Sequence, residues 1–131
     1  MRETKLWTWH LITGAVIFVL LGLHMLTMHL GGLTHYGVSN PSLDPTAVRN
    51  VLARDRTVAF TVGYIVLLGA ALYHGLYGLR NILRELTLKP ATEKLLGGVL
   101  VALGLGLFGL GTWAALAARA LAFAAKMHGK V

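Results

Sequence analysis

The stretch TVAFTVGYIVLLGAALYHGLYGL, residues 57–79, contains no formally charged side chain, and His74 is its only group that titrates near neutral pH. A helix needs about 20 predominantly apolar residues to cross the hydrocarbon core of a bilayer, so this stretch is long enough. Two further runs, residues 6–30 and 95–118, are also free of formal charge. We therefore expect an integral membrane protein, because a spanning helix satisfies its backbone N–H and C=O groups internally.

The predicted fold class is an all-α membrane protein with three transmembrane helices that run antiparallel, up-down-up. The chain is expected to form one transmembrane domain over residues 1–131, with helices at about residues 6–30, 57–85 and 93–124. Residues 45–54 are expected to form a short surface helix that starts at Asp44 and Pro45, or to extend the second helix outward. The first run is too long for the apolar core of a signal peptide, so we interpret it as a retained helix.

The composition agrees with a membrane location, since 56% of the residues are hydrophobic and 13% are charged. There is no cysteine, so the chain itself offers no disulfide, iron–sulfur cluster or thiolate-bound haem. A net charge of +7 suits a protein among anionic lipids, and nucleic-acid binding has no other support. The 12 lysine and arginine residues divide six and six between the two membrane faces, so the positive-inside rule does not orient the chain.

The third helix carries small residues at every seventh position. They are Gly97, Gly104, Gly111, Ala118 and Ala125. Small side chains let membrane helices approach closely, so this pattern predicts tight packing against a partner.

Three of the six histidines, His10, His24 and His74, lie inside apolar runs, where an ionisable group is costly and often marks a functional site. Any one of them alone could equally be a neutral histidine that hydrogen-bonds a neighbouring helix. Three together favour a cofactor. No carboxylate or cysteine lies within a helical turn of His24 or His74, so axial ligation of b-type haem fits better than a clustered zinc or copper site.

Depth in the membrane separates these histidines. With a rise of ~1.5 Å per residue, His24 and His74 lie ~9 Å from the midpoints of their helices in opposite directions, ~18 Å apart in depth. They cannot ligate one iron, so two haems are predicted, with His74 and His24 as iron ligands. His10 lies on the same side as His74, so the remaining ligand of the His74 haem is expected from His10 or from another subunit. Gly78, one turn beyond His74, would leave room for a flat macrocycle.

Two sequence motifs resemble a known family. Residues 74–85, HGLYGLRNILRE, resemble the His-x-x-x-Gly-(Ile/Leu)-Arg motif of succinate dehydrogenase cytochrome b subunits, in which the histidine is a haem ligand. Residues 10–14, HLITG, resemble the His-Arg-x-Ser-Gly motif of that family, and His24 matches the distal-haem ligand of its two-haem members. Leu11 and Leu86 depart from the family pattern at positions that help form the quinone pocket in one-haem relatives, so the quinone site is expected elsewhere or on a partner.

The resemblance implies a haem-b anchor of a succinate:quinone oxidoreductase-type complex, a multi-pass protein of the inner (cytoplasmic) membrane. Such an anchor is not catalytic alone. It would work with a flavoprotein subunit, an iron–sulfur subunit and a second anchor subunit, passing electrons from succinate in the tricarboxylic acid cycle to membrane quinone. One or two haems b would be shared with the partner. Arg80 and Arg84 are candidates either to pair with haem propionates or to extend their charged ends to the lipid headgroups. The alternatives are a haem-b anchor of a hydrogenase or heterodisulfide reductase, or a haem-free scaffold or small transporter subunit.

Overall fold

The structure, a computed structural model, describes residues 2–29, 48–86 and 89–128, which are helical apart from short turns and caps. Its four helices are α1 (Arg2–His29), α2 (Val48–Asp55), α3 (Val58–Glu85) and α4 (Pro90–Met127). Helices α1, α3 and α4 are each long and apolar enough to cross a membrane. The predicted all-α class with three candidate spans is therefore confirmed for the described residues.

The long helices continue beyond the apolar runs that predict them. Helix α1 begins at Arg2, and α4 extends from Pro90 to Met127, so that both include charged residues. Hydropathy marks where a chain meets hydrocarbon, whereas a helix ends only where its backbone is interrupted. Pro90 begins α4 because proline suits the first turn of a helix, where its missing N–H is not needed. At ~1.5 Å per residue, the 38 residues of α4 span ~57 Å, well beyond a ~30 Å hydrocarbon core.

The segment before α3 forms a separate short helix, α2, and does not extend α3. The two helices are joined at Arg56 and Thr57, where the Thr57 N–H donates to the Arg54 carbonyl at 2.9 Å. The extended backbone of Thr57 then starts a new helix at Val58. The predicted helix start at Asp44 and Pro45 lies outside the described residues.

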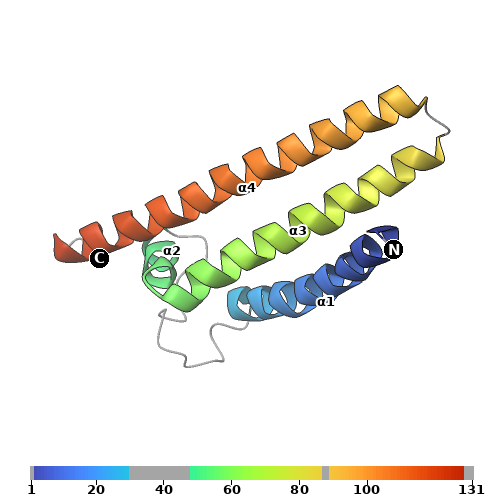
Figure 1. Cartoon of the computed structure of the whole chain (residues 1–131). Helices are drawn as coiled ribbons and strands as arrows, with labels where there is room; N and C mark the ends of the chain where they lie inside the picture. Colours follow the sequence, from blue (N-terminus) through green and yellow to red (C-terminus); the bar gives the residue numbers. More distant parts are fainter. Residues whose placement is uncertain (1, 30–47, 87–88, 129–131) are drawn as a thin grey trace.

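Helix α3 is the centre of the arrangement (Figure 1). Helices α1 and α4 pack on two different sides of it and, within the described ranges, do not pack on each other. His10 contacts His74 while His24 contacts Tyr64, so α1 and α3 run antiparallel. The Arg84–Glu93 ion pair near the α3–α4 connection begins a second antiparallel pair.

The glycines of α4 explain its close packing on α3. A Cβ at Gly104 would lie 2.8 Å from Cδ1 of Leu76, and a Cβ at Gly111 would clash with Cδ2 of Leu68. Gly106 and Gly109 point into open space. The predicted seven-residue pattern thus packs, at Gly104 and Gly111, against a helix of the same chain.

At the far end, α2 packs against the C-terminal part of α4 (Figure 1). Ala122 is fully buried there, and Asn50, Arg54 and Asp55 are also buried although polar. Burial raises the pKa of the Asp55 carboxyl, and the neighbouring Arg54 guanidinium partly opposes this. The polar residues of this junction belong to α2, which lies outside the three candidate spans.

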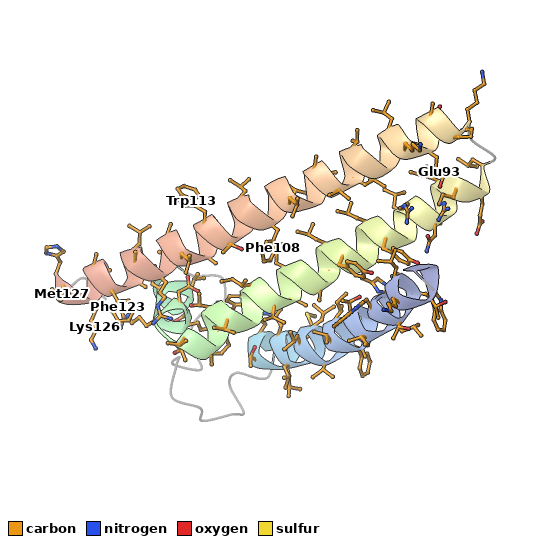
Figure 2. The ribbon with its side chains drawn as sticks, in the orientation of Figure 1. Glu93, Phe108, Trp113, Phe123, Lys126 and Met127 are labelled. Atoms are coloured by element: carbon orange, nitrogen blue, oxygen red, sulfur yellow. The ribbon has the colours of Figure 1, made fainter. Side chains whose placement is uncertain are left out.

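Very little apolar surface is buried within the chain. Among the described residues, the buried hydrophobic side chains are Ala70, Tyr77 and Ala122. Figure 2 shows Phe108 directed from α4 toward α3 and Trp113 directed away from it, and Trp113 is 68% exposed. Apolar surface on this scale requires a cover of lipid or of other subunits.

We predict that Gly111→Leu destabilises the α3–α4 pair, because the new side chain would occupy the position of Leu68. Overpacking of this kind costs about 1–3 kcal/mol. Gly109→Leu is the matched control, since it adds the same side chain to the open side of α4. Thermal unfolding of the purified protein in detergent should show a lower midpoint for Gly111→Leu only. Equal midpoints for the two variants would contradict the packing.

Candidate functional site

His10 and His74, predicted to share one depth in the membrane, are in direct contact where α1 crosses α3. Their ring centroids are 4.0 Å apart and their planes differ by 10°. Tyr77 lies beside them, with its ring centroid 5.2 Å from that of His10. Stacked rings at this separation leave no room for a macrocycle between them, so in this arrangement His10 and His74 do not hold one iron from opposite faces.

The imidazole of His74 is oriented by a backbone group of α1. Its Nδ1 lies 3.1 Å from the carbonyl oxygen of His10. A carbonyl oxygen only accepts hydrogen bonds, so Nδ1 carries the hydrogen and donates it. In a neutral imidazole the free lone pair is then on Nε2. His74 therefore has the tautomer that an Nε2 metal ligand requires.

Two glycines face the two rings. A Cβ at Gly14 would lie 3.1 Å from Cε1 and 3.3 Å from Nδ1 of His74. A Cβ at Gly78 would lie 3.5 Å from Cε1 of His10, which is an ordinary contact. Gly78, predicted to clear space beside His74, thus faces the ring of His10. The tighter fit is at Gly14, opposite His74 itself.

His10 has a different environment. Its ring lies between His74 and Tyr77, and its Nδ1 is buried with no hydrogen-bond partner in the described part of the chain. A buried polar atom without a partner is uncommon and calls for an explanation, such as a bound group. The carbonyl of His10 accepts a hydrogen bond from His74, whereas Nδ1 of the His10 ring has no hydrogen-bond partner among the described residues.

Two tyrosines of α3 complete this site, and the sequence analysis did not single them out. The hydroxyl of Tyr73 donates to the carbonyl of Leu6 at 3.0 Å, which ties α3 to the start of α1. Tyr73 and Tyr77 stack with ring centroids 5.8 Å apart. Tyr73 and Tyr77 are four residues apart, and this spacing was the available signal, because residues four apart share one helix face.

His24 lies apart from the His10–His74 pair. Its ring makes an edge-on contact with Tyr64, at a centroid distance of 5.8 Å. Tyr64 precedes His74 by ten residues, which is ~15 Å along α3 and close to the ~18 Å expected from the sequence. The Nδ1 of His24 is also buried without a hydrogen-bond partner among the described residues. His10 and His24 of α1 therefore lie at different positions along the helix axis of α3.

The two arginines near the end of α3 face α4. Arg84 forms an ion pair with Glu93. The Nε of Arg80 lies 4.0 Å from the position of a Cβ at Gly97, so Arg80 packs toward α4. The role predicted for Arg80 and Arg84, binding haem propionates, stays a prediction, and this placement favours a different partner for Arg80.

A groove of about 580 Å³ lies between α3 and α4 and reaches the start of α1. Its lining is apolar and aromatic except for one arginine: Leu6, Gly69, Leu72, Tyr73, Leu76, Tyr77, Arg80, Gly97, Leu100, Val101, Gly104, Leu105 and Phe108. The volume lies within the ~300–1,000 Å³ of typical small-molecule sites. Arg80 is its single charged residue and stands near one end, so the groove suits a long apolar molecule with a polar head.

The donor set agrees with haem better than with a clustered metal. No group of three or more histidine or acidic side chains that could hold an ion occurs in residues 2–29, 48–86 and 89–128. A haem needs only axial ligands, and His74, with Nδ1 hydrogen-bonded and Nε2 available, is chemically suited to be one. The unsatisfied Nδ1 atoms of His10 and His24 mark polar positions that a bound group would explain.

Comparison with known proteins identifies the family. A family model described as succinate dehydrogenase/fumarate reductase transmembrane subunit matches residues 2–111. The chain belongs to this family. The match extends over α1, α2, α3 and more than half of α4, so it includes His10, His24 and His74. No curated protein and no solved structure gave a match.

Proposed function

We propose that this family member is the haem-b-binding membrane anchor of a succinate:quinone oxidoreductase-type complex. Haem b, when bound, supplies a one-electron carrier within the membrane. The observation that carries the proposal is the hydrogen bond from His74 Nδ1 to the His10 carbonyl. Such a bond orients a metal-binding imidazole and increases the basicity of its free nitrogen.

The chain provides one axial ligand at this level, Nε2 of His74. His10 stacks on His74 and cannot take the opposite position without leaving that contact. The second ligand is therefore assigned to a second membrane-anchor subunit, which would also cover the exposed apolar surface of α1 and α3. A haem shared in this way would strengthen the association of the two subunits.

The wider setting follows from the family. The chain is proposed to span the inner (cytoplasmic) membrane, with its N-terminus and the α3–α4 connection facing the cytoplasm. A flavoprotein subunit and an iron–sulfur subunit would dock there. Electrons from succinate would pass through these subunits, as a step of the tricarboxylic acid cycle, to membrane quinone. The proposed role of this chain is to bind and orient the haem and to exclude water from it.

The groove between α3 and α4 is the proposed place of quinone. Its lining includes Leu6, Arg80 and Gly97, which lie toward the proposed cytoplasmic end, and its apolar walls suit an isoprenoid tail. Arg80, which has no hydrogen bond or ion pair within the described ranges, would donate to a quinone carbonyl. The departures at Leu11 and Leu86 from the family pattern agree with a site displaced from the one-haem relatives.

Purification of the complex, followed by cofactor analysis, distinguishes the proposed function from two alternatives. A hydrogenase- or heterodisulfide reductase-type anchor would bring haem without a succinate-oxidising flavoprotein, and a scaffold or transporter subunit would bring no haem. Reduced-minus-oxidised spectra and flavin analysis of the purified complex distinguish all three. The family match favours the first function, because its members belong to succinate dehydrogenase and fumarate reductase.

We predict that His74→Ala removes the haem that His74 ligates. Oxidation of succinate by an artificial dye should persist in the assembled complex, because the soluble subunits perform it. His128→Ala is the control, since His128 is exposed at the end of α4. The measurement is haem content per flavin by pyridine haemochrome. Full haem content in His74→Ala would rule out the ligand assignment.

For the groove, we predict that Gly97→Leu slows quinone reduction about tenfold, corresponding to ~1.4 kcal/mol, because the side chain would enter the groove beside Arg80. Gly98→Leu is the matched control, because a Cβ at Gly98 meets nothing within 4 Å. Succinate-to-quinone and succinate-to-dye rates should be compared in both variants. Equal quinone rates in the two variants would place the quinone elsewhere.

The third prediction for this function is that the complex holds two haems, with His24 as a ligand of the second. The separation of ~15 Å along α3 between Tyr64, which contacts His24, and His74 excludes a shared iron. Haem counting should give two per complex, and His24→Ala should reduce this to one while the His74-dependent spectrum persists. One haem in the unmodified complex would refute the role of His24, which would then be a histidine packed on Tyr64.

A further inference from the structure

The backbone carbonyl of His10 in α1 faces the side chain of His74 in α3, and Gly14 makes this approach possible. Residues four apart lie on the same face of a helix, and each Cα–Cβ bond tilts toward the N-terminus. A side chain at position 14 would therefore project beside the carbonyl of His10, which is the group that His74 approaches at 3.1 Å. Glycine at this position leaves the carbonyl open.

The clearance at Gly14 is small. A Cβ there would lie 3.1 Å from Cε1 and 3.3 Å from Nδ1 of His74, closer than the ~3.5–4.0 Å of favourable carbon contacts. The imidazole cannot retreat by sliding across α1, because the ring of His10 covers one of its faces at 4.0 Å. Even one methyl group would therefore move His74 away from its acceptor by a few tenths of an ångström.

The carbonyl of His10 is within hydrogen-bonding distance of both His74 and the hydroxyl of Thr13. The hydroxyl of Thr13 lies 3.0 Å from the carbonyl of His10 and 2.9 Å from that of Trp9. Thr13 therefore has the Trp9 carbonyl as an alternative acceptor when His74 donates to His10. A carbonyl oxygen also has two lone pairs, so it accepts a side-chain hydrogen bond in addition to one within the helix.

We propose that Gly14 is a positioning residue for the haem ligand: by leaving the His10 carbonyl open, it holds His74 in the tautomer and orientation that direct Nε2 at the iron. The inference rests on the proposed function, in which His74 ligates haem. A donated Nδ1–H makes Nε2 more basic, and a more basic axial ligand favours the oxidised iron. Gly14 thus lowers the midpoint potential of this haem.

The test compares Gly14→Ala with Gly22→Ala in the assembled complex. Both variants add one methyl group to α1, but a Cβ at Gly22 would meet nothing within 4 Å. In Gly14→Ala we expect the reduction equilibrium of the His74-dependent haem to shift about tenfold toward the reduced form, ~59 mV for one electron. The Gly22→Ala potential should match that of the unmodified complex. Equal potentials in all three proteins would overturn the proposal.

A second readout serves if Gly14→Ala binds too little haem to titrate. Nitrogen-15 NMR of labelled histidine in the haem-depleted complex reports which ring nitrogen of His74 carries the hydrogen. The Nδ1–H form should dominate in the unmodified protein and in Gly22→Ala, and should decline in Gly14→Ala. An unchanged tautomer would overturn the role of Gly14. Full haem content in His74→Ala would instead reject the proposed function, so the two failures are distinguishable.

Discussion

The hydrogen bond between His74 Nδ1 and the His10 carbonyl sets the geometry of the α1–α3 pair. An imidazole inside a membrane needs a partner for its N–H, because hydrocarbon offers none and an unsatisfied polar group there is costly. A side chain reaches a backbone carbonyl of another helix only if the helices approach closely. That approach depends on Gly14, and the resulting register brings His24 to Tyr64 and Leu6 to Tyr73.

Helix α3 uses its two packed sides differently. The side toward α1 is polar for a membrane interior, with His74 and Tyr77 against His10. The side toward α4 combines a tight contact at Gly104 and Gly111 with an apolar groove that ends at Arg80. The His10–His74 contact and the groove thus lie on two sides of one helix, and Tyr73 and Tyr77 border both. The exposed outer surfaces of α1 and α4 leave the chain dependent on lipid and partner subunits.

The sequence predicted the parts of this arrangement that follow from position along a helix. Charge-free runs located the three spans, and counting residues placed His10 level with His74 and His24 apart from both. It did not predict what depends on rotation about the helix axes. The direct stacking of His10 on His74, the turn of Arg80 toward α4 and the fit of Gly14 against His74 all require the relative rotation of two helices. Depth alone also left Tyr73 and Tyr77 unnoticed, because tyrosine in an apolar run resembles ordinary packing. The ends of α4 were missed because hydropathy reports the hydrocarbon boundary and not the end of a helix.

The most direct test of this account is an experimental structure of the assembled complex with its cofactors, determined by electron cryo-microscopy. The account predicts haem iron bonded to Nε2 of His74, Nδ1 of the same ring at hydrogen-bonding distance from the His10 carbonyl, and the opposite ligand supplied by a second anchor subunit. Iron held by His10, or a His74 ring bound through Nδ1 or distant from any haem, would contradict it.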